Sequence, residues 1–350
     1  MQEVTVHASR DYRILIGTGL LPRLGQEAAR CVKGRKVCIV SESNVYPHHG
    51  AAAEESLKKA GFTVVSYVFS AGESSKNGQN YLTLLNFLAE NQLTRADLLI
   101  ALGGGVVGDL CGFAAATYLR GVAFIQVPTT LLAAVDSSVG GKTAIDLPAG
   151  KNLAGAFYQP SLVLCDTNTL STLPDEIFRD GCAEVIKYGI LYDRNFFDYL
   201  RSTGVSFDRE KVIRRCVELK RNVVAEDEFD TGARMKLNLG HTVGHGIEAN
   251  SQFAVSHGKA VAIGTAIVSR AAAKCGMLSQ ADANAIVDIL NAYGLPTATE
   301  YSAEELAHYM LSDKKRSGGT VNLIIPREIG RCEIIPTPVE KLAAFVEAGL

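Results

Sequence analysis

Three of the seven histidines in this 350-residue chain fall within residues 241–257. If residues 234–249 form one helix, four polar side chains at positions i, i+4, i+7 and i+11 share one of its faces: Arg234, Asn238, His241 and His245. Two histidines four residues apart on a helix are a common way to present two ligands to one metal ion. This spacing predicts a metal site, and His257 is a further candidate ligand.

A lone histidine on an apolar helix face is more often a core residue than a metal ligand. Three histidines close together, with the carboxylate of Glu184 available on another predicted helix, favour the metal site. Histidine and carboxylate ligands without a thiolate, and with one position left open, suit catalytic zinc. Lys187 lies three residues after Glu184, so an ordinary surface ion pair remains an alternative for these two residues.

A glycine-rich segment, residues 103–109, follows a predicted buried strand and begins a predicted helix. Backbone N–H groups in such a turn, together with the helix N-terminus, can bind a pyrophosphate. A tight turn without a ligand is the alternative. Glu42 ends an earlier strand, where an acidic side chain can accept hydrogen bonds from a ribose, and this favours NAD over NADP.

Two lysines, Lys142 and Lys151, fall in a glycine-containing segment that we expect to form a loop. Small and apolar residues surround both lysines, which favours binding of an anionic substrate over solvated surface positions. Lys220 and Arg234 are weak indications when each is taken alone.

Strands alternate with helices through the first part of the chain, which predicts a doubly wound, mostly parallel α/β sheet that binds a dinucleotide. After about residue 160 helical patterns dominate: 174–190, 194–202, 208–226, 234–249, 257–275, 279–293 and 302–311. A short strand pair follows at 320–325 and 331–335. We therefore expect an α/β domain over 1–160, a mainly helical metal- and substrate-binding domain over 161–350, and an active site in the cleft between them.

Composition excludes several classes of protein. The net charge of −2 argues against a broad nucleic-acid-binding surface. The most apolar region, residues 98–128, is interrupted by glycines and by charged residues, so we expect no membrane span. Eight cysteines without a C-x-x-C motif are typical of reduced thiols in the cytoplasm.

Five motifs together give the chain a resemblance to the 3-dehydroquinate synthase family. They are Gly103-Gly-Gly-Val-Val-Gly-Asp109, Asp136-Ser-Ser-Val-Gly-Gly-Lys142, Gly150-Lys-Asn-Leu-Ala-Gly-Ala-Phe-Tyr-Gln-Pro160, Ala183-Glu-Val-Ile-Lys187 and Leu237-Asn-Leu-Gly-His-Thr-Val-Gly-His245. The match runs in order from about residue 36 to residue 316, and each motif is several residues long.

The resemblance implies a carbon–oxygen lyase of the shikimate pathway, acting on a small phosphorylated sugar acid. The family converts 3-deoxy-D-arabino-heptulosonate 7-phosphate to 3-dehydroquinate and phosphate. NAD transiently oxidises C5, phosphate leaves by β-elimination, the hydride returns, and the opened ring closes by an intramolecular aldol step. A divalent metal, zinc or cobalt, assists. The resemblance also implies a homodimer.

The resemblance assigns roles to individual residues. The metal ligands correspond to Glu184, His241 and His257. The phosphate site corresponds to Lys142, Asn238, His245 and Lys314, with Arg120 reaching in from a second subunit. The carboxylate binders correspond to Lys220 and Arg234, and the residues around the reacting hydroxyls to Asp136, Asn152 and Lys187. The dinucleotide contacts correspond to Glu42, Glu73, Lys76, Gly104, Gly105, Val106, Asp109, Thr129, Thr130, Asp136, Lys142, Lys151, Thr172 and Leu173.

Four positions depart from the usual family pattern. Glu42 stands where aspartate is common, and Ala144 and Asp146 stand where glycine and asparagine are expected. Ile177 stands where many members have glutamate. These departures affect details of cofactor contact and leave the expected reaction unchanged.

Three other functions compete with this interpretation. A zinc-dependent polyol or glycerol dehydrogenase on the same fold would explain the glycine turn and the metal site, but not the cations suited to phosphate and carboxylate. Another sugar-phosphate cyclase would not need Lys220 and Arg234 for a carboxylate. A metal-stabilised binding module would not need an open metal position beside a dinucleotide site.

Overall fold

The structure is a computed structural model, and it describes residues 1–252, 254–312 and 319–350. The chain divides into two compact units, and each is formed by two stretches of sequence. Unit 1 contains residues 1–174 and 209–229, and unit 2 contains residues 175–208 and 230–350. Among the described helices, none is long and apolar enough to cross a membrane.

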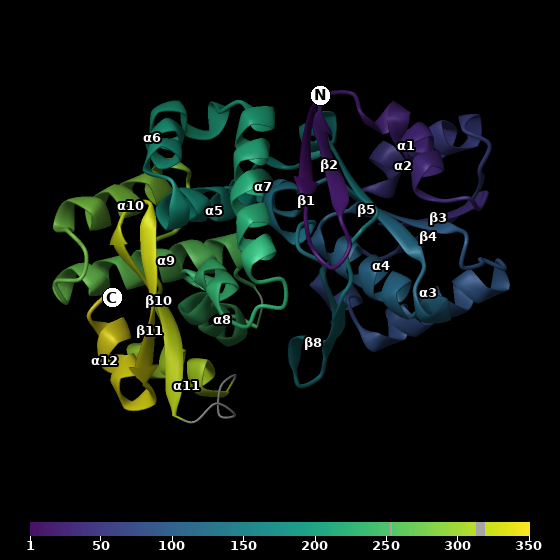
Figure 1. The fold of residues 1–350 in the computed structure, drawn as a ribbon. Helices are drawn as coiled ribbons and strands as arrows, with labels where there is room; N and C mark the ends of the chain where they lie inside the picture. The colour runs from purple at the N-terminus through teal and green to yellow at the C-terminus, as the bar shows by residue number, and fades with distance from the viewer. Residues whose placement is uncertain (253, 313–318) are drawn as a thin grey trace. The chain divides into compact units, whose positions relative to one another are not determined.

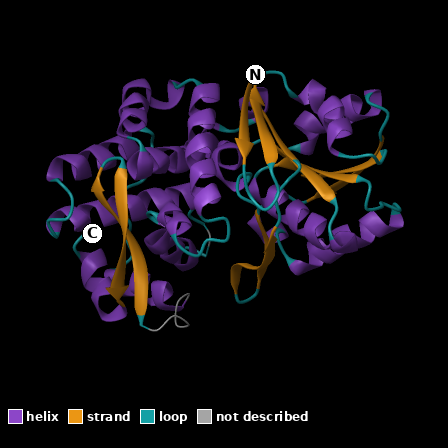
Figure 2. Ribbon diagram, in the orientation of Figure 1, coloured by secondary structure: helices purple, strands orange, loops and turns teal. Residues whose placement is uncertain are grey.

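A seven-stranded sheet forms the centre of unit 1 (Figures 1 and 2). Its strand order is β1 (Gln2–Val6), β2 (Tyr12–Gly17), β9 (Leu162–Asp166), β6 (Ala123–Pro128), β5 (Leu98–Gly103), β3 (Lys36–Glu42) and β4 (Thr63–Phe69). The β1–β2 pair is antiparallel, and every other pair in the sheet is parallel. This arrangement confirms the predicted doubly wound, mostly parallel sheet.

Helices cover both faces of this sheet, which explains why its central strands are apolar on both sides. Alternate residues of β3 face opposite cores: Val37 and Ile39 pack with α1 (Leu24–Cys31) and α2 (Tyr46–Lys59). Cys38 and Val40 pack with α3 (Gly78–Glu90) and α4 (Gly105–Thr117). Figure 1 shows the two helix pairs on opposite faces of the sheet.

The segment that carries Lys142 and Lys151 is an antiparallel hairpin, so the predicted loop is wrong. Its strands are β7 (Lys142–Leu147) and β8 (Gly150–Phe157). The β7 strand alternates between exposed and buried residues, and Thr143 packs where Gly112 of α4 leaves room. A Cβ atom at position 112 would lie 2.4 Å from a Thr143 methyl carbon. Packing on α4 therefore stabilises this strand, although the small residues of the segment do not predict one.

Unit 2 is mainly helical, as predicted. Its elements are α5 (Asp175–Tyr192), α6 (Arg194–Thr203), a 3₁₀ helix (Ala233–Asn238), α8 (His241–Asn250), α9 (His257–Lys274), α10 (Gln280–Ala292), α11 (Ala303–Ser312), β10 (Thr320–Glu328), β11 (Arg331–Pro338) and α12 (Leu342–Glu347). Helix α9 contacts α5, α8, α10, α12 and β10, and most of its residues are buried. It is the central helix for α5, α8, α10 and α12, whereas α11 packs on α8 and α12.

The units divide the chain differently from the expected boundary at residue 160. Strand β9 belongs to unit 1 because it pairs with β2 and β6 of the large sheet. Helix α7 (Arg209–Glu226) also belongs to unit 1, where it packs on β1 and β2. Its helical periodicity could not reveal that it returns to the α/β unit.

The predicted single helix over 234–249 is wrong. The 3₁₀ helix Ala233–Asn238 ends before Gly240, and α8 begins at His241. Gly240 has a φ of 76°, in the left-handed region that favours glycine. A Cβ atom there would lie 2.6 Å from the Val261 carbonyl oxygen of α9. Close approach of α9 therefore accounts for the glycine, and Arg234 and Asn238 do not share a helix with the two histidines.

Candidate functional site

Glu184, His241 and His257 form a cluster in unit 2 that could hold a metal ion. Each offers one ligand atom, and the three atoms lie within 4.8 Å of one another. Oε1 of Glu184 is 3.4 Å from Nε2 of His241 and 3.3 Å from Nε2 of His257. The structure thus brings together the three residues predicted as ligands, from α5, the start of α8 and the start of α9.

An acceptor oxygen lies beside Nδ1 of each histidine. Nδ1 of His241 lies 3.1 Å from the Leu239 carbonyl oxygen, which can only accept, so Nδ1 donates. Nδ1 of His257 lies 3.6 Å from Oε2 of Glu248. Nε2 of each ring is directed at Glu184 Oε1, where a metal ion could take the place of the proton that His257 holds there.

Glu248 is a site residue that the sequence analysis missed. It lies on α8, one turn after His245, and is 3% exposed. A glutamate between Ile247 and Ala249 on an otherwise apolar turn was a signal that could have identified it, because buried carboxylates need partners.

Backbone contact between α8 and α9 sets the spacing of the two histidines. A Cβ atom at Gly264 of α9 would lie 2.1 Å from the Gly240 carbonyl oxygen. A Cβ atom at Gly244 would lie 3.0 Å from the Ala260 carbonyl oxygen. These glycines let the helices meet closely, so His241 and His257 approach the same carboxylate oxygen.

Lys187 forms an ion pair with Oε2 of Glu184, the carboxylate oxygen not directed at the histidines. The side chains of Lys187 and Glu184 are 2% and 0% exposed, so an ordinary surface ion pair is excluded. The lysine neutralises the carboxylate on one side and leaves Oε1 directed toward the imidazoles.

The two histidines have opposite pKa shifts. Burial, with the nearby positive charge of Lys187, lowers the pKa of His241 to about 3. Burial alone would lower the pKa of His257 as well, but the hydrogen bonds and charges of Glu184 and Glu248 raise it to about 10. A metal ion bound at Nε2 of His257 must displace a proton there, so metal uptake weakens as the pH falls.

Of the other predicted residues of unit 2, His245 lies beside this cluster. The His245 ring centroid is 5.6 Å from that of His241, and His245 is not part of the candidate metal group. Arg234 is 2% exposed and lies in the 3₁₀ helix that Asn238 ends. Lys314, predicted for the phosphate site, lies outside the described residues.

In unit 1, several predicted cofactor residues gather around Lys76. Its Nζ lies 2.7 Å from Glu73 Oε1 and 3.3 Å from Asp109 Oδ2, and donates to Asn152 Oδ1 at 2.8 Å. A third carboxylate, Asp146, is 3.8 Å away. Burial would lower the pKa of Lys76, but the carboxylates outweigh it and raise the pKa. Burial raises the pKa of Asp109 to about 6, against the attraction of Lys76.

The glycine turn lies where the carboxyl ends of β5 and β3 meet, which is the switch point of the sheet order and the usual place for a dinucleotide. A Cβ atom at Gly104 would lie 3.0 Å from the Thr130 methyl carbon, and one at Gly105 would lie 3.3 Å from Ser137 Oγ. Thr129 Oγ1 and Ser137 Oγ are buried and make no hydrogen bond to any described residue. Such orphaned hydroxyls fit a ligand with polar groups.

Five further predicted cofactor residues lie in unit 1. Glu42 ends β3, and its Oε2 accepts the Asn44 N–H at 2.7 Å. Thr172 Oγ1 lies 2.9 Å from Nε2 of His49 on α2. Val106 is in the first turn of α4, Leu173 follows Thr172, and Lys151 is the second residue of β8.

Asp136 and Lys220 pair with each other in unit 1. Nζ of Lys220 lies 2.8 Å from Asp136 Oδ1 and donates to the Asp136 carbonyl oxygen at 2.7 Å. Lys220 is 5% exposed on α7, so this contact ties α7 to the segment before β7. The resemblance implies separate substrate roles for these two residues, and their pairing could not be predicted from the sequence.

Arg120 lies in a strained turn after α4. Leu119 and Arg120 have φ values of 51° and 67°, a region that residues other than glycine rarely adopt. Such strain is found most often where a side chain has a functional position. Arg120 itself is exposed.

The departures from the family pattern have different surroundings. Asp146 belongs to the Lys76 cluster, and its Oδ1 accepts the Asn152 N–H at 2.8 Å. Ala144 pairs across the hairpin with Gly155. Ile177 is 48% exposed, and nothing in the structure explains an isoleucine there.

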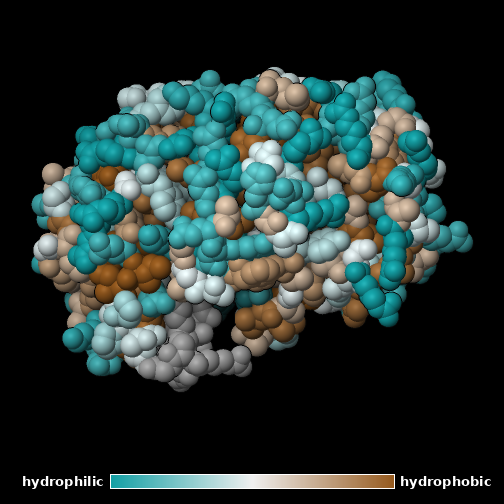
Figure 3. Space-filling model, in the orientation of Figure 1, coloured by the Kyte–Doolittle hydropathy of each residue, from teal (hydrophilic) through white to brown (hydrophobic). Residues whose placement is uncertain are grey.

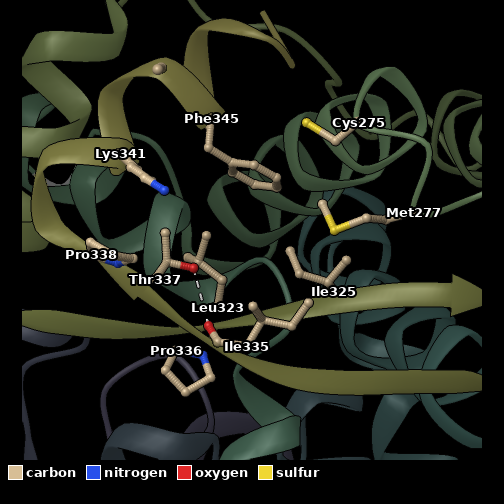
Figure 4. Close-up of a pocket in the computed structure, with 11 residues that line it drawn as sticks. Cys275, Met277, Leu323, Ile325, Ile335, Pro336, Thr337, Pro338, Lys341 and Phe345 are labelled. Atoms are coloured by element: carbon tan, nitrogen blue, oxygen red, sulfur yellow. Dashed lines mark hydrogen bonds between the residues drawn. The ribbon is translucent and has the colours of Figure 1, made fainter.

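An apolar pocket of about 420 Å³ lies elsewhere in unit 2 (Figure 4). Its lining includes Met277, Leu323, Ile325, Ile335 and Phe345, with Lys341 as the charged residue. None of the predicted site residues lines it. On the face shown in Figure 3, hydrophobic residues lie in patches between hydrophilic ones, as on most protein surfaces.

Comparison with known sequences identifies both parts of the chain. Residues 66–180 match the family model described as 3-dehydroquinate synthase N-terminal, and residues 181–316 match the C-terminal model. A 3-dehydroquinate synthase of Clostridium beijerinckii is 44% identical over 347 residues, covering 97% of this chain and 99% of that protein. One from Caulobacter vibrioides is 45% identical over 336 residues, covering 92% and 91%.

Solved structures agree with the fold. A 2-deoxy-scyllo-inosose synthase complexed with carbaglucose-6-phosphate, NAD+ and Co2+ has a TM-score of 0.90 at 25% identity, covering all of both chains. The 2-epi-5-epi-valiolone synthase of Streptomyces hygroscopicus, with NAD+ and Zn2+ bound, has a TM-score of 0.88 at 25% identity, covering 99% and 98%. A glycerol dehydrogenase from Schizosaccharomyces pombe, 18% identical with a TM-score of 0.65, shares the fold over 98% of this chain and 91% of its own.

The sequence matches span nearly the whole chain at an identity well above that of the other cyclases and the dehydrogenase. The chain belongs to the 3-dehydroquinate synthase family.

Proposed function

We propose that the protein converts 3-deoxy-D-arabino-heptulosonate 7-phosphate to 3-dehydroquinate and phosphate, as a carbon–oxygen lyase. The observation that carries this proposal is the identity of 41–45% to curated 3-dehydroquinate synthases over more than nine-tenths of the chain. The 2-deoxy-scyllo-inosose and valiolone synthases are only 25% identical to this chain, and the glycerol dehydrogenase is 18% identical. Their activities are therefore less favoured as the function of this chain.

The proposed reaction uses two bound groups, NAD and a divalent metal ion. When bound, NAD supplies a hydride acceptor and donor, and zinc or cobalt supplies a Lewis acid for the C5 oxygen. Glu184, His241 and His257 would hold the metal ion, since three protein ligands leave one position open to substrate. The glycine turn and the orphaned hydroxyls of Thr129 and Ser137 would receive the dinucleotide, with Glu42 at the ribose.

The substrate's two anionic ends call for separate groups of cations. Lys220 and Arg234 would bind the carboxylate, and Lys142, Asn238 and His245 the phosphate, together with Lys314. The exposed Arg120 would serve the phosphate site of a second copy of the chain, which makes the active form a homodimer.

The proton beside the new ketone needs an acceptor during elimination. The carboxylates of Glu184, Asp136 and Asp109 are each paired with a lysine. We therefore assign proton removal to the departing phosphate itself. A phosphonate analogue that cannot reach this proton should stall at elimination, and normal turnover of such an analogue would refute this step.

All eight cysteines are free thiols, and six of them are buried. Burial raises the pKa of Cys38, Cys165 and Cys332 to about 12, so these thiols are protonated and unreactive at neutral pH. Free thiols in this number fit the reducing cytoplasm, where we place the reaction.

One assay tests the proposed reaction. The protein is incubated with the heptulosonate phosphate, catalytic NAD and zinc, and inorganic phosphate and NADH are followed together. We expect phosphate release without net NADH. A dehydrogenase would accumulate NADH in proportion to product, and that outcome would overturn the proposal.

Matched histidine variants test the ligand assignment. His257→Ala should abolish metal binding and activity, because it removes one of three ligands. His245→Ala removes a neighbouring imidazole outside the metal group, so it should retain the metal and lose elimination rate. Metal content by elemental analysis and phosphate release distinguish the two. Survival of zinc and turnover in His257→Ala would show that the ligand set is wrong.

A further inference from the structure

The backbone around His257 is held by a side chain from another helix. Asp180 lies on α5, four residues before Glu184. Its carboxylate accepts hydrogen bonds from Ser256 Oγ at 2.5 Å, the Gly258 N–H at 3.1 Å and the Lys259 N–H at 2.9 Å. These groups flank His257, the first residue of α9. Asp180 therefore acts as the N-terminal cap of α9 from a different helix, in place of the usual local cap.

Glycine at position 258 makes this contact geometrically possible. A Cβ atom there would lie 2.0 Å from the Asp180 carbonyl oxygen and 2.7 Å from the Asp180 carboxyl carbon. Any larger residue would push the start of α9 away from α5. The distance between the Glu184 carboxylate and the His257 ring depends on this approach, because each residue lies within one turn of the contact.

Glu248 contacts the imidazole ring of the same histidine, His257. It is 3% exposed, and its Oε2 lies 3.6 Å from Nδ1 of His257, while Nε2 lies 3.3 Å from Glu184. Helix α8 thus provides one ligand, His241, and two turns later the carboxylate that directs another ligand. An acceptor at Nδ1 fixes the ring orientation and raises the basicity of the ligating nitrogen.

We propose that Asp180 and Glu248 are positioning residues for the metal ion, Asp180 through the backbone of His257 and Glu248 through its ring. This inference rests on the metal site of the proposed function and goes beyond its three ligands. The two carboxylates tie α9 to α5 and α8, so that the three ligand atoms already converge before a metal ion arrives. Without either tie, the metal ion would itself have to order His257.

The α5–α9 interface provides a matched control. Glu176 and Lys259 also form an ion pair between these helices, but their side chains are 75% and 34% exposed. Glu176→Gln removes a cross-helix charge without touching the His257 backbone or ring. An exposed pair of this kind contributes little, so neither metal affinity nor stability should change appreciably.

The test measures zinc affinity directly, independent of turnover. The full chain is stripped of metal, and zinc is titrated in competition with a chromophoric chelator. Outer carboxylates of metal-bound histidines typically contribute about 10- to 100-fold in affinity, so Glu248→Ala should weaken zinc binding by that range and Glu248→Gln, which keeps an acceptor oxygen, by less. Asp180→Ala should weaken it by about 10-fold, and Glu176→Gln by less than about twofold.

Cobalt spectra and unfolding curves separate positioning from general stability. With cobalt bound, Glu248 variants should shift the visible absorption bands, which report ligand geometry, while Glu176→Gln leaves them unchanged. If Asp180→Ala or Glu248→Ala does not fold, Asp180→Asn and Glu248→Gln carry the test. Variants that lower the unfolding midpoint of the metal-free chain but keep the parental zinc affinity and cobalt spectrum would overturn the proposal.

This outcome is distinct from failure of the proposed function. If the parent chain binds zinc with the expected dependence on Asp180 and Glu248 but releases no phosphate from the heptulosonate phosphate, the positioning roles stand and the proposed reaction falls. If the parent releases phosphate but substitution of Asp180 or Glu248 leaves the zinc affinity unchanged, the proposed reaction stands and the positioning roles are wrong.

Discussion

The two units each gather buried charge, but with opposite signs at the centre. In unit 1 one cation, Lys76, is surrounded by three carboxylates, those of Glu73, Asp109 and Asp146. In unit 2 one carboxylate, Glu184, is surrounded by the ammonium group of Lys187 and two imidazoles. The first cluster has more negative charge than its cation balances. The second presents a carboxylate oxygen and two ring nitrogens to a single point.

This difference in charge indicates that the two clusters depend differently on a bound cation. The carboxylates around Lys76 are 35%, 19% and 20% exposed, so water shares in solvating the excess charge. Glu184 is fully buried and cannot be solvated in this way. We infer that the unit 1 cluster is complete without a further cation, whereas the unit 2 cluster is organised to receive one.

Removing the central charge of each cluster should have the largest effect on the free energy of unfolding, and the loss should be greater in unit 2. Glu184→Gln leaves Lys187 buried without its carboxylate, and breaking such a pair costs about 3 to 5 kcal/mol. Lys76→Met leaves three partly solvated carboxylates, so we expect a smaller loss of about 1 to 2 kcal/mol. Urea unfolding of the metal-free chain measures both losses.

The same two variants should differ in metal binding. Glu184→Gln should also remove high-affinity zinc binding, while Lys76→Met should leave it unchanged because Lys76 is not one of the three candidate ligands. A larger loss of stability in Lys76→Met than in Glu184→Gln would contradict the distinction between a solvated and a buried cluster.

The pH dependence of stability tests how well the carboxylate of Asp109 is solvated in unit 1. The pKa of Asp109 rises from 3.8 to about 6 on folding, chiefly through burial. Between these values the folded chain holds a proton that the unfolded chain has released, so stability falls as the pH rises from about 4 to 6. A pKa change of this size corresponds to about 3 kcal/mol at most. Asp109→Asn should lack this decline, so its stability relative to the parent should increase over the same window.

Unfolding midpoints at pH 4, 5, 6 and 7, in the absence of NAD and metal, measure this difference. Asp198→Asn is the control, because Asp198 is half exposed and belongs to unit 2, whereas the Lys76 cluster belongs to unit 1. A difference between Asp109→Asn and the parent that stays constant from pH 4 to 7 would show that folding does not raise the pKa of Asp109.

The sequence contained enough to predict the sheet and to select the three candidate ligands. Strands such as Leu98–Gly103 are apolar throughout, and a strand of this kind between helices predicts a parallel sheet covered on both faces. Glu184, His241 and His257 could be selected because few residue types bind zinc and because they stand in long, specific motifs.

What the sequence did not reveal depends on contacts between distant segments. Gly240 could stand inside a helix or end one, and its left-handed conformation follows from the approach of Val261 and Gly264 on α9. Glu248 and Asp180 are each ordinary helix residues until α5, α8 and α9 pack together. The pairing of Lys220 with Asp136 likewise depends on the return of α7 to unit 1.

The smallest expected effect concerns Asp146, which stands where the family usually has asparagine. Its Oδ1 accepts the N–H of Asn152, whose φ of 56° needs such support, and lies 3.8 Å from Lys76. The oxygen of an asparagine can accept the same hydrogen bond, so Asp146→Asn should change stability by less than about 0.5 kcal/mol. Asp146→Ala removes the acceptor and should cost about 1 to 2 kcal/mol.

Urea midpoints and NAD affinity by fluorescence titration compare the two variants with the parent. If Asp146→Asn weakened the chain as much as Asp146→Ala, the charge at position 146 would matter more than the acceptor oxygen. Unit 1 would then hold Lys76 by a balance of charges as strict as the one around Glu184. A near-neutral Asp146→Asn would instead show that the third carboxylate is dispensable, because two carboxylates and the Asn152 amide oxygen already satisfy the three donors of the lysine.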